Sequence, residues 1–387
     1  MSKQTDPPSI SLDTPSLHVA SVFMGMPVGG AEDLAIAFAD TLPNPEIQTH
    51  FVCLRELGIL GKEIKNAQKH PIEQIRVAPG KRFSPVGLFR LIRWLRKHKI
   101  DIVHSHTYHA HAYAIRAARW LGIPSILHHH KTADDLKKMK PRRRRGLGKL
   151  LHKSSAILTL SKQSALDLQT AYKLPDKKFH TIENPVNRKA FAPLSPEKIT
   201  QQRSKLGLAK DRFLIGTVAS LNAVKNHTAT LQAATNLETN CDLIILGEGK
   251  ERSHLEKLAS SPEIHTPIFL MGNQRPIAPW MQCFDLFVLP SLWEGQSLAL
   301  LQAISTEIPI LASCIEGNTT LLGHDHPGLF DPNNIPAYAQ LLKRATEETT
   351  FRNQLLAHQK KLTLPTLEDA TQNLLQIYKK LSMEKAT

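Results

Sequence analysis

The residues best placed to do chemistry lie in the segment 289–311, LPSLWEGQSLALLQAISTEIPIL, where one carboxylate, Glu294, stands in a loop that contains Gly and Ser. The apolar run before this loop is typical of a buried strand, and the pattern over Leu298–Ser305 predicts the first turns of a helix. In open α/β sheets, ligands bind beyond the carboxyl ends of the strands, where helix N-termini offer unpaired N–H groups to anions. We therefore expect a phosphate-bearing ligand at this loop, beside the Glu294 carboxylate.

Two further loops follow predicted strands. Lys225 stands near the end of GTVASLNAVKNH, at a predicted loop-to-helix junction where its ammonium could reach a diphosphate. The pair Gly29-Gly30 follows the first predicted strand and would let the backbone approach an anion. A loop lysine is more often a plain surface residue and a Gly-Gly pair a plain turn, but positions at strand ends favour binding. The pair does not form the G-x-G-x-x-G fingerprint, which argues against a nicotinamide enzyme.

The chain has 19 histidines, with two clusters at the ends of predicted strands. The first cluster comprises His104, His106, His109 and His111, and the second comprises His128, His129 and His130. Alternation along the second run places His128 and His130 on one face. No carboxylate or cysteine stands at a spacing that would complete a zinc site, so we expect no metal. A single histidine that lines the ligand site is the preferred interpretation, and the others would be structural.

Composition sets the class of protein. A length of 387 residues with 41% hydrophobic residues indicates two globular domains. The chain contains no run of about 18 apolar residues, so the sequence predicts no membrane-spanning helix. Its polar N-terminus does not have the pattern of a secretory signal, and its four dispersed cysteines are typical of reduced thiols. We therefore expect a cytoplasmic protein.

The basic charge is uneven. Basic residues outnumber acidic ones by 49 to 34, and Lys131–Lys153 and Arg90–Lys99 carry much of the excess. These segments could be solvated helix faces or could bind an anionic membrane surface. No nucleic-acid motif accompanies the charge, so we expect no nucleic-acid partner. Leu91, Trp94 and Leu95 recur at helical spacing, which favours a peripheral membrane contact by an amphipathic helix.

Strand-like runs alternate with helical patterns along the whole chain, which is typical of a parallel, doubly wound α/β sheet. The alternation starts afresh after a polar stretch that contains prolines. We predict a tail at 1–16, a first Rossmann-like domain at 17–186, a connector at 187–210, a second Rossmann-like domain at 211–362 and a terminal helix at 363–387. By analogy with other two-domain folds, this helix would pack back on the first domain.

Several motifs occur together in a definite order. The segment after Leu289 reads P-S, two residues, E-G-x-x-L and then Q-A, and V-x-x-L-x-x-x-K-N-H falls at Val218–His227. L-G-E-G-x-x-R falls at Leu246–Arg252, E-N-P-V at Glu183–Val186, and H-S-H precedes G-I-P and a strand that ends in histidine. In this order and spacing they resemble the retaining nucleotide-sugar glycosyltransferases of family 4, over nearly the whole chain. The resemblance implies a GT-B fold, in which an acceptor domain and a donor domain face each other across a cleft.

The resemblance also implies roles for matching positions. Glu294 would bind hydroxyls of the donor sugar, and His130 would lie near the reacting sugar. Lys225 would contact the pyrophosphate, and the glycine turn would face it. The implied donor-binding residues are Gly29, Gly30, Ser220, Lys225, Met271, Gly272, Gly295, Gln296, Ser297, Leu298 and Gln302. Of these, Met271 and Gly272 would offer backbone groups to the base.

Three positions depart from the family pattern. Ser220 stands where the family often has arginine, which leaves more of the phosphate binding to Lys225. Gln302 replaces the second acid, so a ribose hydroxyl would lose a charge-assisted hydrogen bond worth roughly 1 kcal/mol. Ser297 replaces a glycine, which we expect to narrow the backbone conformations of the loop.

The activity implied is retaining transfer of a hexose-type sugar from a UDP- or GDP-linked donor to a saccharide or lipid-linked acceptor. The setting would be bacterial lipopolysaccharide, O-antigen or capsule assembly at the inner face of the cytoplasmic membrane. We expect no cofactor, no metal and no covalent nucleophile, because Lys225 and helix amides would stabilise the leaving diphosphate. Two alternatives stay open, a non-catalytic nucleotide-sugar-binding partner and an epimerase or phosphorylase on the same fold. The joint presence of Glu294, Lys225 and His130 favours the transferase.

Overall fold

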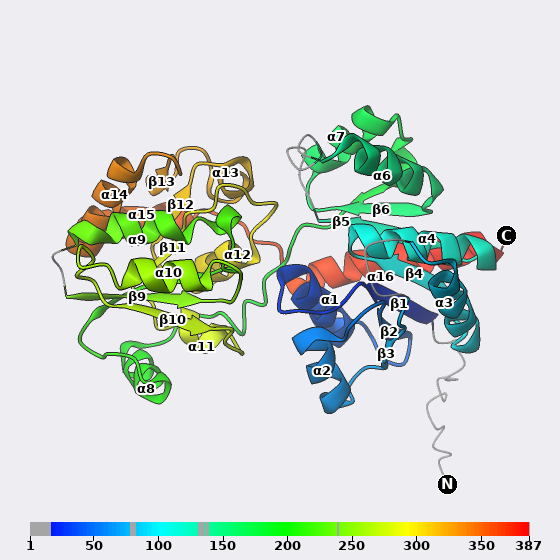
Figure 1. Cartoon of the computed structure of the whole chain (residues 1–387), viewed down its shortest axis with the longest axis horizontal. Helices are drawn as coiled ribbons and strands as arrows, with labels where there is room; N and C mark the ends of the chain where they lie inside the picture. The colour runs from blue at the N-terminus through cyan, green and yellow to red at the C-terminus, as the bar shows by residue number, and fades with distance from the viewer. Residues whose placement is uncertain (1–16, 78–82, 131–135, 137–138, 238–239, 387) are drawn as a thin grey trace, which may run out of the picture.

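Two parallel sheets occupy separate halves of the chain (Figure 1). The computed structural model describes residues 17–77, 83–130, 136, 139–237 and 240–386. The first sheet has seven strands in the order β3-β2-β1-β4-β5-β6-β7, and the second has six in the order β10-β9-β8-β11-β12-β13. Neighbouring strands within each sheet are parallel. The predicted doubly wound α/β architecture is therefore confirmed.

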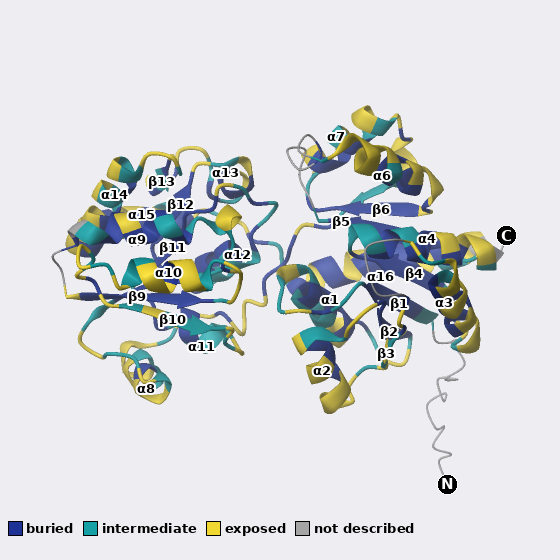
Figure 2. Ribbon diagram, in the orientation of Figure 1, coloured by how far each residue is buried: buried dark blue, intermediate teal, exposed yellow. Residues whose placement is uncertain are grey.

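The first domain is built on strands and helices that alternate along the chain. Its strands are β1 (Leu17–Phe23), β2 (Ile47–Cys53), β3 (Ile72–Gln74), β4 (Ile102–Ser105), β5 (Ser125–His129), β6 (Ala156–Thr159) and β7 (Phe179–Thr181). Its helices are α1 (Gly30–Thr41), α2 (Gly58–Ala67), α3 (Pro85–Lys97), α4 (Tyr108–Leu121), α6 (Pro141–Lys153) and α7 (Lys162–Tyr172), with a short η1 (Asp176–Lys178). Strands β4, β5 and β6 are buried at every position, because helices cover both faces of the sheet (Figure 2).

Helix α3 forms as the periodicity predicts, but its apolar face has a different use. Leu91, Trp94 and Leu95 are buried in one core cluster with residues of β1, β2, β4 and α4. The indole of Trp94 is 7% exposed and donates a hydrogen bond to Glu73. The expectation that these three side chains contact a membrane is therefore wrong, since the helix uses them to pack on its own sheet.

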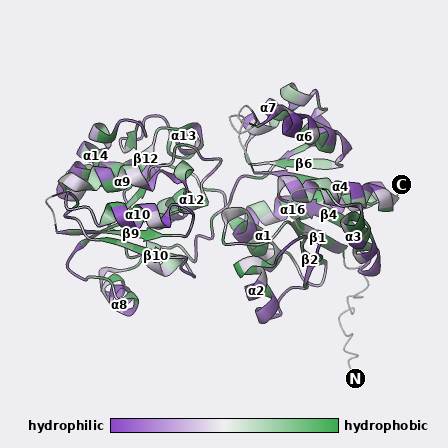
Figure 3. Cartoon of the chain, viewed as in Figure 1, coloured by the Kyte–Doolittle hydropathy of each residue, from purple (hydrophilic) through white to green (hydrophobic). Residues whose placement is uncertain are grey.

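The second domain repeats the alternation. Its strands are β8 (Phe213–Val218), β9 (Cys241–Leu246), β10 (Ile268–Gly272), β11 (Leu286–Leu289), β12 (Ile310–Ser313) and β13 (Leu329–Phe330). Its helices are α9 (His227–Ala233), α10 (Arg252–Ala259), α11 (Ala278–Met281), α12 (Leu298–Ser305), α13 (Glu316–Leu322), α14 (Ile335–Glu347) and α15 (Thr349–Gln359), with short η2 (Ala223–Lys225) and η3 (Ala234–Asn236). In the colouring of Figure 3, hydrophobic strands such as β9 lie inside and hydrophilic residues follow the outer faces of helices such as α10.

The predicted connector contains a helix, α8 (Pro196–Leu206). Its Arg203 is buried, donates to the carbonyl oxygen of Cys283 at 2.7 Å and pairs with Asp285 at 2.7 Å. This segment is thereby fixed on the second domain. The chain crosses between the domains twice at one place, where Val186 bridges Thr366 and its N–H donates to the carbonyl of Pro365.

The last helix, α16 (Leu367–Ala386), lies against the first domain, as the red helix in Figure 1 shows. Leu374 and Leu375 share a core cluster with Val19 of β1, Leu34 of α1 and Ile102 of β4. The second half of the chain thus supplies part of the core of the first. No helix in the described part of the chain is long and apolar enough to cross a membrane.

Candidate functional site

Glu294 lies in the loop between β11 and α12, and it is only 7% exposed. Its carboxylate accepts hydrogen bonds from the Nζ atom of Lys225 at 2.6 and 2.8 Å and from the hydroxyl of Ser291 at 2.7 Å. Burying a carboxylate is costly unless a cation and hydrogen bonds compensate it, and these two partners do so. The structure therefore brings together two residues predicted from distant motifs. Ser291 belongs to the same sequence motif, and its hydrogen bond to Glu294 follows only from the folded loop.

The loop that carries Lys225 is ordered by an asparagine. The Asn222 side-chain oxygen accepts from the N–H groups of Val224 and Lys225, at 3.0 and 3.2 Å. Its amide donates to the hydroxyl of Ser220 at 2.8 Å. Ser220 therefore supports the loop, at the position where the family often has an arginine that would bind phosphate. The N–H of Leu292 donates to the carbonyl of Val224, which joins this loop to that of Glu294. Asn222 is itself the sequence signal for this turn, because asparagine side chains commonly cap tight turns.

The N-terminus of α12 lies at the junction of the two domains. Ser297 caps the helix by accepting from the N–H of Leu300, and its φ of −73° is open to any residue. The conformation that the loop adopts at Ser297 therefore does not require glycine, and the expected narrowing of its backbone conformations stays a prediction. The side-chain oxygen of Gln296 accepts from the N–H of Asn184 at 2.6 Å, and the Asn184 amide donates back to the carbonyl of Gln296 at 2.8 Å. Asn184 belongs to the first crossing between the domains, so this crossing holds the loop.

Residues of the first domain approach α12 from the other side. A Cβ atom on Gly295 would lie 3.2 Å from the carbonyl oxygen of His130, and one on Gly30 would lie 3.1 Å from a methyl carbon of Leu298. Both glycines thus permit close approach between the domains. Gly29 caps α1 with an extended backbone, φ −171°, that any residue adopts. The structure places Gly30 and His130 of the first domain beside Leu298 and Gly295 of the second at this junction.

The predicted base-binding residues end strand β10. Gly272 has φ +71°, a left-handed conformation that favours glycine, and its carbonyl accepts from the N–H of Gly247 at 2.8 Å. The carbonyl of Met271 accepts from the side-chain amide of Gln274 at 2.6 Å. Within the described part of the chain, the amide of Gln302 makes no hydrogen bond, and the residue is partly exposed on α12. The roles of these residues stay predictions.

Four histidines form an array on one face of the first sheet. His104 lies in β4 and His106 directly after that strand ends. In the same way, His128 lies in β5 and His130 directly after its end. Burial lowers the pKa of His104 to about 3 and that of His130 to about 4, so both are neutral at pH 7. The ring nitrogens of His104, His106 and His128 lie close enough together to hold a metal ion. However, His104 already hydrogen-bonds Tyr378 at 2.7 Å and His106 already hydrogen-bonds Ser21 at 2.9 Å, which fits a hydrogen-bonded cluster.

Known families match almost the whole chain. Residues 28–190 match the family described as Glycosyltransferase Family 4, and residues 198–361 match Glycosyl transferases group 1. The chain belongs to the family 4, group 1 glycosyltransferases. The resemblance given by the sequence motifs is thereby confirmed.

Several curated relatives of this glycosyltransferase come from bacteria. The chain is 27% identical over 353 residues to the UDP-Gal:alpha-D-GlcNAc-diphosphoundecaprenol alpha-1,3-galactosyltransferase of Escherichia coli, which covers 86% of this chain and 88% of that protein. It is 26% identical to the putative glycosyltransferase EpsF of Bacillus subtilis, over 77% of this chain and 78% of that protein. Among solved structures, HepE of Anabaena with UDP and glucose has a TM-score of 0.79 at 17% identity, over 93% of this chain and 99% of that one. This likeness confirms the GT-B fold.

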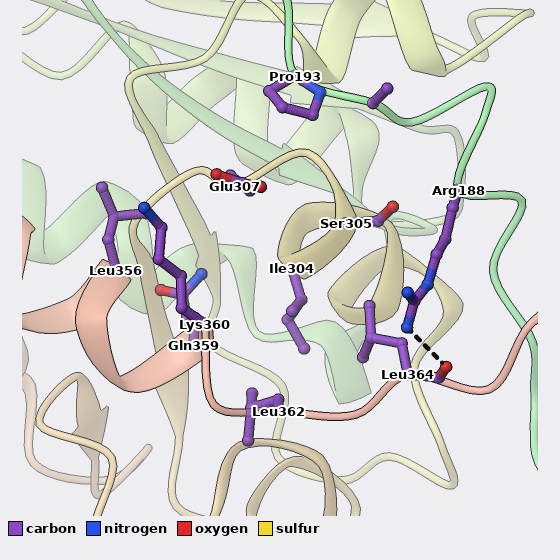
Figure 4. A pocket seen from close by; sticks show the side chains of 11 residues that line it. Arg188, Pro193, Ile304, Ser305, Glu307, Leu356, Gln359, Lys360, Leu362 and Leu364 are labelled. Atoms are coloured by element: carbon purple, nitrogen blue, oxygen red, sulfur yellow. Dashed lines mark hydrogen bonds between the residues drawn. The ribbon is translucent and has the colours of Figure 1, made fainter.

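A cavity of about 300 Å³ in this glycosyltransferase lies away from the predicted site (Figure 4). Arg188 lines one side and donates to the carbonyl of Leu364, while Lys360 and Gln359 lie opposite. None of the residues predicted from the sequence lines it. It lies beside the two crossings and the end of α12.

Proposed function

We propose that this glycosyltransferase is a metal-independent, retaining enzyme that moves a hexose from a nucleotide diphosphate sugar to a saccharide or lipid-linked acceptor. The observation that carries this proposal is that Lys225 contacts Glu294 in the loop before α12. The same loop lies against the backbone of His130 from the first domain. The Escherichia coli relative is named for a UDP-galactose donor and a diphosphoundecaprenol acceptor, and HepE was solved with UDP. These names favour a UDP-linked donor over a GDP-linked one, and assembly of a bacterial surface polysaccharide as the setting.

The chemistry follows from where charge develops. As the bond between the sugar and the diphosphate breaks, negative charge grows on the leaving phosphate. Lys225, which shares its ammonium with Glu294, and N–H groups at the start of α12 supply hydrogen-bond donors for it. The acceptor oxygen forms the new bond on the same face of the sugar, and its proton passes to the leaving phosphate.

Glu294 fits a binding role better than a nucleophilic one. Its carboxylate is held by Lys225 and Ser291 and lies 7% exposed, so its remaining lone pairs can accept hydrogen bonds from sugar hydroxyls. A glycosyl adduct trapped on Glu294, or azide rescue of a Glu294→Ala variant, would contradict this role. We expect neither.

Thermal-shift measurements with UDP, GDP and ADP sugars test the proposal. A ligand at 100 times its dissociation constant adds about 2.7 kcal/mol of stability, which is easily seen. We expect a shift with UDP sugars, hexose transfer that EDTA does not abolish, and NMR spectra of the product with the anomeric configuration of the donor. A shift without turnover would favour the nucleotide-sugar-binding partner, and no shift with any nucleotide would refute the donor site. Loss of transfer on EDTA treatment would refute metal independence, and inversion would refute retention.

We further propose that the first domain binds the anionic inner face of the cytoplasmic membrane. The charged residues of Arg90–Lys99 at positions 90, 93, 96, 97 and 99 are exposed, as are all the arginines of α6. Val86, Phe89 and Trp120 are exposed at 62, 65 and 74%, so these apolar side chains replace the buried Trp94 as candidates for insertion. Positions 131–135 and 137–138 of the predicted basic segment lie outside the described residues.

Sedimentation with liposomes tests this contact. We expect binding to vesicles that contain anionic lipid, weakened by salt and by the pair Phe89→Ala and Arg93→Glu. Phe269→Ala provides a matched control, because Phe269 is 44% exposed on the second domain. Equal binding to neutral and anionic vesicles, or binding to neither, would refute the electrostatic contact.

A further inference from the structure

Ser21, His106 and His130 form a polar row across three neighbouring strands. Strands β1, β4 and β5 are adjacent in the sheet, and period-two alternation puts the three side chains on one face. The Ser21 hydroxyl oxygen lies 2.9 Å from Nε2 of His106. The other nitrogen of that ring, Nδ1, lies 3.5 Å from Nε2 of His130. One histidine therefore connects a buried serine to the residue at the junction of the domains.

The ring of His106 is held so that its two nitrogens cannot exchange places. One face stacks on Phe23, with ring centroids 4.4 Å apart and an angle of 2°. The other face stacks on His104, with centroids 4.2 Å apart and an angle of 28°. His106 is 5% exposed and Phe23 is fully buried, so no space is open for the ring to turn over.

The hydroxyl of Ser21 decides the direction of the hydrogen bonds. Ser21 is 4% exposed, and among the described residues its hydroxyl has His106 as its one partner. If His106 donated to Ser21, the hydroxyl proton would be buried without an acceptor, which is unfavourable. Ser21 therefore donates to Nε2 of His106. A neutral imidazole carries its one proton on the other nitrogen, so His106 donates from Nδ1 to Nε2 of His130.

A second row reinforces the first. The buried hydroxyl of Tyr378, on α16, lies 2.7 Å from Nδ1 of His104, and Nε2 of His104 lies 3.3 Å from Nδ1 of His128. This row stacks on the first, with centroids 3.9 Å apart between His128 and His130. The two rows hold one another in register.

We infer that Ser21 and His106 are positioning residues that hold His130 as the Nδ1–H tautomer. The inference rests on the proposed function and on the predicted position of His130 near the reacting sugar. His130 then presents an N–H donor, and not a lone pair, to an oxygen atom of the nucleotide sugar. A neutral N–H donor suits a sugar hydroxyl or a phosphate oxygen, neither of which needs a base at that position.

Nitrogen-15 NMR of the protein with labelled histidine reads the tautomer directly and without turnover. We expect the His130 signals of an Nδ1–H imidazole at pH 7.5, and a mixed population in Ser21→Ala. Ser154→Ala removes another buried hydroxyl of the same domain, one that donates to the carbonyl of Leu151, and should leave the signals unchanged. An Nε2–H signal for His130 in the wild-type protein would overturn the inference.

Amide side chains provide a second test, because the nitrogen of asparagine can stand in for Nδ1 of histidine and that of glutamine for Nε2. We expect His130→Asn to keep a kcat about tenfold above that of His130→Gln. His106→Asn should stay within about threefold of wild type, whereas His106→Leu should lower kcat by about 10- to 100-fold with little change in KM. The reverse order within either pair would overturn the inference. If the wild-type protein transfers no sugar, the proposed function fails, while the NMR result still decides the tautomer.

Discussion

At the scale of residues, the site is held by short polar contacts between loops that lie far apart in the sequence. Lys225 and Glu294 neutralise each other, with side-chain exposures of 23 and 7%, before any ligand binds. A bound donor would therefore meet an ion pair that is already formed, with its diphosphate at Lys225 and its sugar hydroxyls at Glu294. Because each partner compensates the other, changes at either position affect stability as well as activity.

We expect Lys225→Met to lower the free energy of unfolding by about 2 kcal/mol, because it leaves the Glu294 carboxylate buried beside only a hydroxyl. Adding Glu294→Gln should recover most of that loss, since no unpaired charge remains. Urea unfolding of both single variants and the double variant measures the coupling. Losses that simply add would contradict a structural pair.

Gln302 offers a test in which a substitution is expected to strengthen binding of the nucleotide. We expect Gln302→Glu to strengthen binding of a nucleotide diphosphate about fivefold, because a charged acceptor of a ribose hydroxyl gains about 1 kcal/mol. Gln201→Glu, on the exposed face of α8, adds the same charge elsewhere and should change nothing. Calorimetric titration with UDP measures both variants. Unchanged or weaker binding by Gln302→Glu would show that position 302 does not reach the ribose.

At the scale of elements, amphipathic helices are ambiguous until their packing is known. Helix α3 has an apolar face that suits either a membrane or a protein core, and the structure assigns Trp94 to the core. For helix α16 the prediction is confirmed. Analogy with other two-domain folds predicts that it packs on the first domain, and its leucines are buried there. An apolar stripe predicts burial but does not name the partner.

Helix α16 should therefore be essential to the first domain. We expect Leu374→Ala to cost about 2–4 kcal/mol of stability, because Leu374 is 1% exposed among side chains of β1, β4 and α1. Met383→Ala on the same helix removes a side chain that is 69% exposed and should cost almost nothing. The midpoints of urea unfolding compare the two. Equal midpoints would mean that α16 does not support the core.

At the scale of the whole molecule, one arginine joins the two domains beyond the chain crossings. Arg275, just after β10, pairs with Asp33 of α1 at 2.6 Å and with Glu63 of α2 at 3.2 Å. All three side chains are at least one-third exposed, so these pairs contribute about 0–1 kcal/mol to stability. We expect them to affect how far apart the two domains lie, because relative motion is the ordinary expectation for two domains of one chain.

We expect Arg275→Asp to increase the radius of gyration measured by small-angle X-ray scattering while the melting midpoint stays within about 2 °C. Like charges would then face Asp33 and Glu63 across the junction. The swap Arg275→Asp with Asp33→Arg restores opposite charges and should restore the wild-type radius. An unchanged radius in the single variant would show that other contacts hold the domains together.

The histidines of both domains make stability depend on pH. Burial lowers the pKa of His130, His227 and His326 to about 4, below the value near 6.5 of an unfolded chain. As pH falls below 6.5 the unfolded state binds protons first, so stability that is complete above pH 6.5 is lost toward pH 4. Each such histidine should cost roughly 1 kcal/mol by pH 5.5.

Thermal midpoints at pH 7.5 and pH 5.5 measure this loss. His326→Phe should flatten the dependence on pH, whereas His254→Asn should not, because His254 is exposed. A midpoint that is equal at the two pH values would contradict neutral, buried histidines.

The sequence by itself determined the fold class and the family, because strand periodicity and motif order are local properties of the chain. Tertiary structure decided three things that no spacing contains. It paired Lys225 with Glu294, and it buried the apolar face of α3 in the core of the first domain. It also aligned Ser21, His106 and His130 across strands β1, β4 and β5. Partners of this kind depend on strand order and helix docking, which bring together residues separated by 24, 69 or 85 positions. Only the folded chain can specify them.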